Sequence, residues 1–162
     1  MTQNRKSVEI YAREINEPMT LALFLKAQLY GCRYKAGSRL AEALYFAPHF
    51  AKRIAKEHPG VNTGISYIAR VESVANATTW QEFRELMIKE RGRVWWNRHK
   101  SLLRDLRQKW SWSKGEQRSF LLLGTPRLAF NPPVRKEGLQ KGKGFLSKNF
   151  LSFDELFDVW GK

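Results

Sequence analysis

The chain has 162 residues, of which 43% are hydrophobic and 13% aromatic, so its length and apolar content predict one domain, residues 1–162, with a sizeable core. Its 29 Lys and Arg against 15 Asp and Glu give a formal charge of +14, which favours a polyanionic partner. The single cysteine, Cys32, excludes an intramolecular disulfide and a cysteine-rich zinc site. No apolar run approaches the length of a membrane span, and no signal peptide is recognised, so we expect a soluble cytoplasmic protein without a membrane partner.

The first elements follow from local patterns. Residues 8–13 alternate apolar and polar side chains, which predicts a first strand. Residues 19–30 are apolar on most sides and contain good helix formers, so we expect a buried helix there, with Pro18 in its first turn and Gly31 as its C-terminal cap.

Residues 42–46 predict another strand, which Pro48 should end. Residues 51–57 are long enough for one or two helical turns before His58-Pro59-Gly60 breaks the chain. The segment from 64 to 74, GISYIARVESV, then alternates with a period of two, apart from Ile68. We expect this segment to be the central strand of the domain.

A long helical region follows this strand. Thr79 and Glu82 match a capping box, which predicts a helix start at residue 79. Gly92 should interrupt or bend the helix. From residue 93 to residue 110 a helix is expected to resume, with one apolar stripe formed by Trp95, Leu102, Leu106 and Trp110.

A basic stripe lies opposite this apolar stripe. Residues 89–109 contain eight basic side chains and two acidic ones. Four of the basic residues fall within roughly 60° of each other on a helical wheel: Arg93, Lys100, Arg104 and Arg107. The pattern predicts a rigid cationic face.

The C-terminal part returns to a sheet pattern. Residues 118–123 and 127–130 predict two strands separated by Gly-Thr-Pro, and Asn-Pro-Pro at 131–133 should leave the sheet. Residues 140–144, Gln-Lys-Gly-Lys-Gly, predict a flexible basic loop without the spacing of a nucleotide-binding P-loop. Ser152 and Glu155 form a second capping box, which opens a closing helix through Trp160.

The order of these segments resembles a known superfamily. The similar segments are Tyr45-Phe46 with the basic stretch after it, GISYIARVESV at 64–74, RLAFNPPV at 127–134, GFLS at 144–147 and SFDELF at 152–157. They resemble the PUA-like superfamily, especially its EVE and ASCH branches. The likeness covers about residues 42–75 and 118–160 and consists of apolar patterns, without a catalytic signature.

The resemblance implies an α/β (α+β) fold with a small bent β-barrel or twisted sheet that a short helix closes. It also implies binding of RNA or DNA, in some members with a modified base in a barrel pocket. The segment from about 78 to 114 departs from the family pattern, because a compact barrel needs far less chain between these strands. We therefore expect a long basic helical insert, which either holds nucleic acid or docks on a larger complex.

These observations favour a nucleic-acid-binding module for RNA or single-stranded DNA, because rigid cations and aromatic rings together bind single strands. The tryptophans Trp96 and Trp112 are candidate stacking surfaces. The candidate phosphate contacts are Arg93, Lys100, Arg104, Arg107, Arg33, Lys35, Arg39, Lys141, Lys143 and Lys148. An alternative is an accessory subunit of a ribonucleoprotein or defence complex that binds through protein contacts.

An enzyme is not expected. The three histidines have no metal-ligand spacing, and the sequence contains no paired carboxylates at metal spacing and no Cys and His nucleophile arrangement, so we predict no cofactor, metal or catalytic residue. The remaining alternative is a hydrolase of the ASCH type acting on RNA or nucleosides. It would use Lys52 or Lys35 with Glu42 or Glu72, and no spacing selects a pair.

Overall fold

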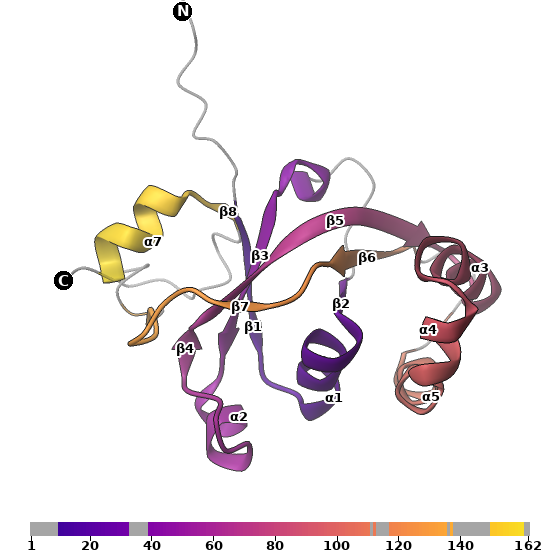
Figure 1. Ribbon diagram of the computed structural model, residues 1–162, viewed down its shortest axis with the longest axis horizontal. Helices are drawn as coiled ribbons and strands as arrows, with labels where there is room; N and C mark the ends of the chain where they lie inside the picture. Colours follow the sequence, from indigo (N-terminus) through magenta and orange to yellow (C-terminus); the bar gives the residue numbers. More distant parts are fainter. Residues whose placement is uncertain are drawn as a thin grey trace, which may run out of the picture.

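The computed structural model describes residues 10–32, 39–110, 112, 117–135, 137 and 150–160. These residues form a mixed α/β fold built on one curled sheet (Figure 1). Its strands are β1 (Ile10–Ile15), β2 (Leu29–Cys32), β3 (Tyr45–Phe50), β4 (Gly64–Ile65), β5 (Tyr67–Ala77), β6 (Arg118–Leu123), β7 (Arg127–Leu128) and β8 (Phe150–Leu151). The expected mixed α/β class is therefore confirmed.

The segment predicted as the central strand, residues 64–74, forms β4 and most of β5, and the long strand β5 lies near the middle of the sheet as expected. The strand order is β2-β6-β5-β3-β1-β8, with β4 paired to β3 and β7 paired to β5. Strands β1 and β3 are parallel, and the other pairs are antiparallel. In Figure 1, β5 arches across the molecule, so that the sheet curls around α1.

The helical elements surround this sheet. Helices α3, α4 and α5 connect the paired strands β5 and β6 and lie together at one end of the molecule (Figure 1). The helices α2 and α7 lie toward the other end. The helical segments are α1 (Pro18–Ala22), η1 (Leu23–Ala27), η2 (Arg39–Glu42), α2 (Lys52–Glu57), α3 (Trp80–Arg91), α4 (Arg93–Arg98), α5 (Lys100–Lys109) and α7 (Phe153–Trp160).

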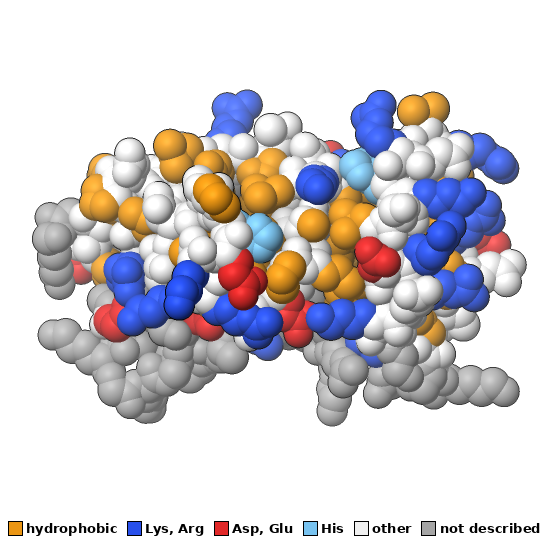
Figure 2. Space-filling model, turned by 90° about the horizontal axis from the view of Figure 1, so that it is seen from below, with side chains coloured by type: hydrophobic (Ala, Val, Ile, Leu, Met, Phe, Trp, Pro, Cys, Tyr) orange, Lys and Arg blue, Asp and Glu red, His pale blue; other side chains and the backbone are white. Residues whose placement is uncertain are grey.

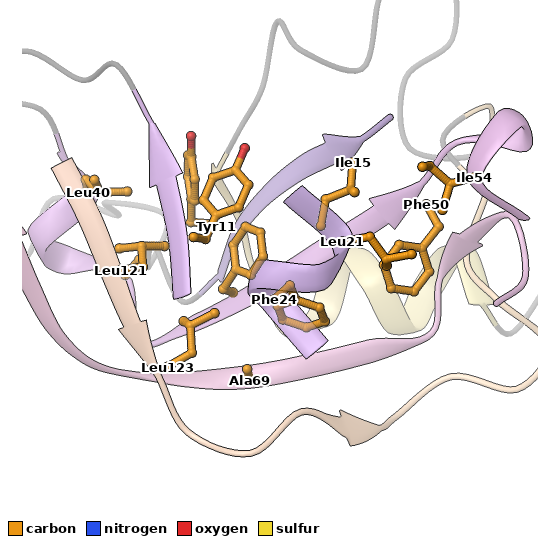
Figure 3. Close-up of a cluster of buried hydrophobic side chains, with 13 residues drawn as sticks. Tyr11, Ile15, Leu21, Phe24, Leu40, Phe50, Ile54, Ala69, Leu121 and Leu123 are labelled. Carbon is orange, nitrogen blue, oxygen red and sulfur yellow. The ribbon is translucent and has the colours of Figure 1, made fainter. Parts of the chain in front are cut away.

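Two hydrophobic clusters lie on opposite faces of β6. Cluster 1 fills the inside of the curl (Figure 3) and includes Tyr11, Phe24, Tyr30, Phe46, Phe50, Leu121 and Leu123. Cluster 2 joins the sheet to the helices α3 to α5 and includes Phe83, Met87, Trp96, Leu103, Leu106, Phe120 and Leu122. The helical insert therefore shares a core with the sheet.

A bulge in β5 lets this strand serve both clusters. Glu72 is an extra residue between the pairs that β5 makes with β6. An extra residue reverses the face on which the following side chains lie. Ala69, before the bulge, lies in cluster 1, whereas Ala75 and Ala77, after it, lie in cluster 2.

The helix expected over residues 19–30 is shorter than predicted. Gln28 has φ of 55° and ends the turn of π-helix η1, and the next residues form β2. These residues pair with β6, so a long-range ladder overrides the local helix propensity. Gly31 lies inside the strand, which contradicts its predicted role as a helix cap.

The strand expected at 42–46 is shifted toward the C-terminus. Residues 39–42 form the 3₁₀ turn η2, and β3 continues through Pro48 to Phe50. Proline is tolerated because β5 pairs with Tyr45 and Phe46, and β4 pairs with His49 and Phe50. Pro48 thus lies where neither antiparallel neighbour needs its missing N–H.

The second helix of the insert is divided. The expected single helix from 93 to 110 consists of α4 and α5, which are separated at His99. The buried side chains are Trp96, Leu103 and Leu106, whereas the partly buried ones are Trp95, Leu102 and Trp110. The predicted apolar stripe is therefore correct at Leu106 and Trp110, and it is displaced by one residue at Trp95 and Leu102.

Candidate nucleic-acid interface

The N-terminal cap of α3 sets the direction in which the insert leaves the sheet. The Thr79 hydroxyl accepts a hydrogen bond from the Glu82 amide at 3.1 Å, as the capping box predicts. The Glu82 carboxylate accepts from the Thr78 amide at 2.9 Å, one residue before the expected donor. Phe83 and Met87 then bury one face of α3 in cluster 2 and leave Arg84 exposed on the other side.

Gly92 separates α3 from α4 at a backbone position with φ of 90°, which favours glycine. After α4, the helix α5 comes to lie beside α3, so that side chains of both helices line one groove. Lys100, Arg104 and Arg107 are exposed on α5, as the helical wheel predicted. The resulting groove between α3 and α5 has a volume of about 280 Å³. It is lined by Trp80, Arg84, Trp96, Lys100, Arg104 and Arg107.

Two arginines in this groove lie over indole rings. The Arg84 guanidinium carbon is 5.8 Å from the Trp96 ring centre, and that of Arg107 is 5.6 Å from the Trp80 ring centre. Both distances suit cation–π attraction, which is worth about 0.5–1 kcal/mol at exposed sites. This attraction restricts two long side chains that would otherwise be free, so the cations are partly preorganised.

The charged residues that line the groove are all cations. Its described lining contains four cations and no carboxylate. Figure 2 shows Lys and Arg side chains gathered over this end of the molecule. A surface of one sign attracts a polyanion and raises its rate of association.

Other basic residues of the insert have structural roles or lie elsewhere. Arg91 donates a hydrogen bond to the Leu123 carbonyl at 2.8 Å, which ties α3 to β6. Lys109 forms an ion pair with Glu17 at 2.7 Å. Arg93 is exposed on α4 and does not line the groove, so the structure brings together three of the four predicted helix cations.

The two predicted stacking tryptophans mainly support the core. Trp96 is only 7% exposed. The Trp112 ring stacks on Phe120, with centres 6.1 Å apart and planes at 8°. Trp80 is partly exposed and is the better stacking candidate. Trp80 and Arg84 were not among the predicted binding residues, although their i, i+4 spacing on one helix could have indicated a shared face.

Several predicted contacts lie outside the described residues. They are Arg33, Lys35, Lys141, Lys143 and Lys148. The backbone of Arg39 begins η2, and its side chain is likewise outside the described part.

His99 lies at the junction of α4 and α5, close to the basic surface. Burial, followed by the charge of Arg98, lowers the pKa of His99 below its ordinary value. Its ring centre is 5.2 Å from that of Trp95. His99 therefore stays neutral at physiological pH and adds no charge to the groove.

Of the residues named for the hydrolase alternative, Lys35 lies outside the described residues, and the other three do not form one site. Glu72 lines a cavity of about 460 Å³ together with Arg70 and Arg127. Lys52 is exposed on α2, and Glu42 is exposed on η2; neither lines this cavity. Within the described residues, no group of three or more His, Cys, Asp or Glu is placed to hold a metal ion.

Comparisons of the chain with known protein families, with curated proteins and with solved structures find no match. In the part of the chain that the structure describes, every helix is too short or too polar to cross a membrane.

Proposed function

We propose that the protein is a nucleic-acid-binding module for RNA or single-stranded DNA, and that the groove between α3 and α5 contacts the phosphate backbone. The observation that carries this proposal is the convergence of Arg84, Lys100, Arg104 and Arg107 on one groove with tryptophan rings. The cations neutralise phosphates, and the partly exposed Trp80 ring offers a stacking face.

The first prediction concerns salt dependence. Each phosphate contact contributes a slope of about −0.7 to −0.9 to a plot of log affinity against log salt, so four contacts give about −3. Changing Lys100, Arg104 and Arg107 together to Glu should weaken binding and reduce the magnitude of the slope by about 2 or more. Fluorescence anisotropy with labelled single- and double-stranded RNA and DNA across a salt series measures both quantities.

The helix α2 provides a matched control. Lys52, Arg53 and Lys56 are exposed there, and α2 lies far from α3 to α5 (Figure 1). Their triple change to Glu alters the net charge equally and should reduce the slope much less. Circular dichroism verifies that both variants are folded. Equal effects of the two triple variants would show that only net charge matters and would reject the groove.

The same assay addresses the alternative functions. A parent protein that binds none of the four nucleic acids would favour an accessory subunit that works through protein contacts. Cleavage of the labelled strand, lost in Glu72→Gln, would favour a hydrolase.

We also infer that the sheet is a PUA-like barrel. Three observations support this inference. The sheet curls around cluster 1, and the segments that resemble the superfamily form β3, β4 and β5. The helix α7 packs beside the sheet through Leu156 and Phe153. An experimental structure in complex with an oligonucleotide would test both the fold type and the groove.

A further inference from the structure

A second cavity opens beside the C-terminal end of β2. Its volume is about 280 Å³. Its walls come from the strands β1, β2 and β6 and from Trp110, the residue after α5. Its lining includes the side chains of Tyr11, Arg13, Tyr30, Cys32, Trp110 and Arg118.

Two guanidinium groups give this cavity its charge. Arg118 is 1% exposed, and its guanidinium carbon lies 4.6 Å from the Trp110 ring centre and 5.9 Å from that of Trp112. Burial of a cation is costly, and these two rings offset part of that cost. Arg13 is partly exposed and lies nearer the solvent. The described lining contains no carboxylate.

The remaining polar groups keep the cavity neutral or positive. Burial raises the pKa of Tyr30, and burial raises the pKa of the Cys32 thiol to about 12, so both stay protonated near neutral pH. The charge of the nearby Arg13 guanidinium partly opposes the rise in the pKa of Tyr30, which indicates that the two groups lie close together in the cavity wall. Cys32 donates to the Ser119 carbonyl, with sulfur and oxygen 3.6 Å apart, and forms part of the wall. The tyrosine hydroxyl oxygens of cluster 1, red in Figure 3, point the same way, away from the aliphatic side chains.

We propose that this cavity binds a phosphate monoester, with Arg13, Arg118 and Tyr30 around the phosphate and the Trp110 ring against the attached group. Guanidinium groups match phosphate geometry and remain charged at all physiological pH values. The volume is close to the lower end of the range for small-molecule sites, roughly 300–1,000 Å³, so it exceeds the needs of a bare phosphate and suits about one nucleotide.

An array of aromatic rings connects this cavity to the groove. From Arg107 the contacts pass through Trp80, Trp112 and Trp110 to Arg118, in steps of 4.6 to 6.4 Å. The phosphate therefore has two possible sources: the terminal phosphate of a strand held in the groove, or a free mononucleotide. The first source rests on the proposed function, and the second does not.

Tryptophan fluorescence titrations test the proposal, because Trp110 lines the cavity. The probes are adenosine monophosphate, adenosine, inorganic phosphate, and one oligonucleotide with a 5′-phosphate, a 3′-phosphate or hydroxyl ends. We expect adenosine monophosphate to bind more tightly than adenosine. Arg13→Gln should weaken its binding about tenfold, as expected for the loss of a charge-assisted hydrogen bond. Arg13→Lys should restore part of the affinity.

Two further variants keep the result interpretable. Tyr30→Phe removes only a hydroxyl group, so it provides a second test if Arg13→Gln does not fold. This variant should bind adenosine monophosphate several-fold more weakly than the parent. Arg53→Gln on α2 should change nothing. A preference for one phosphorylated oligonucleotide that Arg13→Gln abolishes identifies a strand end as the source, and tight binding of adenosine monophosphate without that preference identifies the free nucleotide.

Equal binding of adenosine and adenosine monophosphate, together with equal binding of all three oligonucleotides, would overturn the proposal. The hydroxyl-ended oligonucleotide separates this failure from a failure of the proposed function. Its binding depends on the groove, so it should respond to the triple change in α5 and not to Arg13→Gln.

Discussion

At the scale of single residues, Gly31 controls how closely Trp110 approaches the sheet. A Cβ atom at this position would overlap the Trp110 ring and lie 2.9 Å from Cε1 of Phe120. Gly31→Ala must therefore displace a ring in cluster 2, which should cost about 1–3 kcal/mol. Urea denaturation measures this loss. Gly124→Ala is the control, because its Cβ would lie in ordinary contact with Arg70, at 3.8 Å, and close to the Glu72 carboxylate, at 3.2 Å, and the exposed Glu72 side chain can move. Equal losses in both variants would contradict the explanation.

His99 should make stability depend on pH. Its pKa is lowered in the folded protein by burial and by Arg98, so folding disfavours its protonated form. Above the unfolded pKa of about 6.5, His99 is neutral in both states and does not affect the free energy of unfolding. As the pH drops through that value, the unfolded state binds a proton more readily than the folded state, so the free energy of unfolding falls. His99→Gln should therefore lose less stability than the parent between pH 7.5 and pH 5. The comparison of the two proteins cancels the contributions of all groups that they share. A parallel pH dependence of the two proteins would argue against this role.

At the scale of elements, the cap of α3 fixes where the insert begins. Thr79 accepts from the Glu82 amide, and loss of such a cap costs typically about 1 kcal/mol. We expect Thr79→Ala to lower the free energy of unfolding by about this amount, whereas Thr79→Ser retains the hydroxyl and most of the stability. Chemical denaturation of the three proteins measures the difference. Equal losses in the alanine and serine variants would show that the hydroxyl contributes nothing.

The helices and strands also show which features could be predicted from the sequence. The starts of α3 and α7 were predicted correctly because a cap involves residues only a few positions apart, as at Thr79 and Ser152. The strand β2 was missed because its conformation depends on pairing with β6, far along the chain. The β5 bulge was missed for the same reason, since an extra residue is defined only against a partner strand.

The candidate site was predicted to a similar extent. The positions of Lys100, Arg104 and Arg107 on one exposed face followed from helical periodicity alone. The contribution of Arg84 required knowledge that α3 and α5 lie side by side. The cavity at Arg13 and Arg118 required the sheet topology, because these residues are on strands that meet only in three dimensions.

At the scale of the whole molecule, β6 couples the insert to the sheet. Its six residues are all buried. Leu121 and Leu123 contribute to cluster 1, and Phe120 and Leu122 contribute to cluster 2. Arg91 adds a direct hydrogen bond from α3 to the end of the same strand. Because β6 contributes side chains to both clusters, displacement of β6 from one cluster also removes packing contacts from the other.

We therefore expect the insert and the sheet to unfold in one cooperative step. Five of the six tryptophans lie between residues 80 and 112, so tryptophan fluorescence reports mainly on the insert. Hydrogen exchange at β1 and β3 reports on the part of the sheet distant from the insert.

The buried Phe83 ring lies 4.4 Å from Phe120, centre to centre, and Phe83→Ala should lower the free energy of unfolding by about 3–5 kcal/mol. If the two clusters are coupled, this variant lowers the protection of β1 and β3 by the same free energy as it shifts the fluorescence transition. A loss confined to the fluorescence transition, with β1 and β3 fully protected, would show that the insert unfolds on its own.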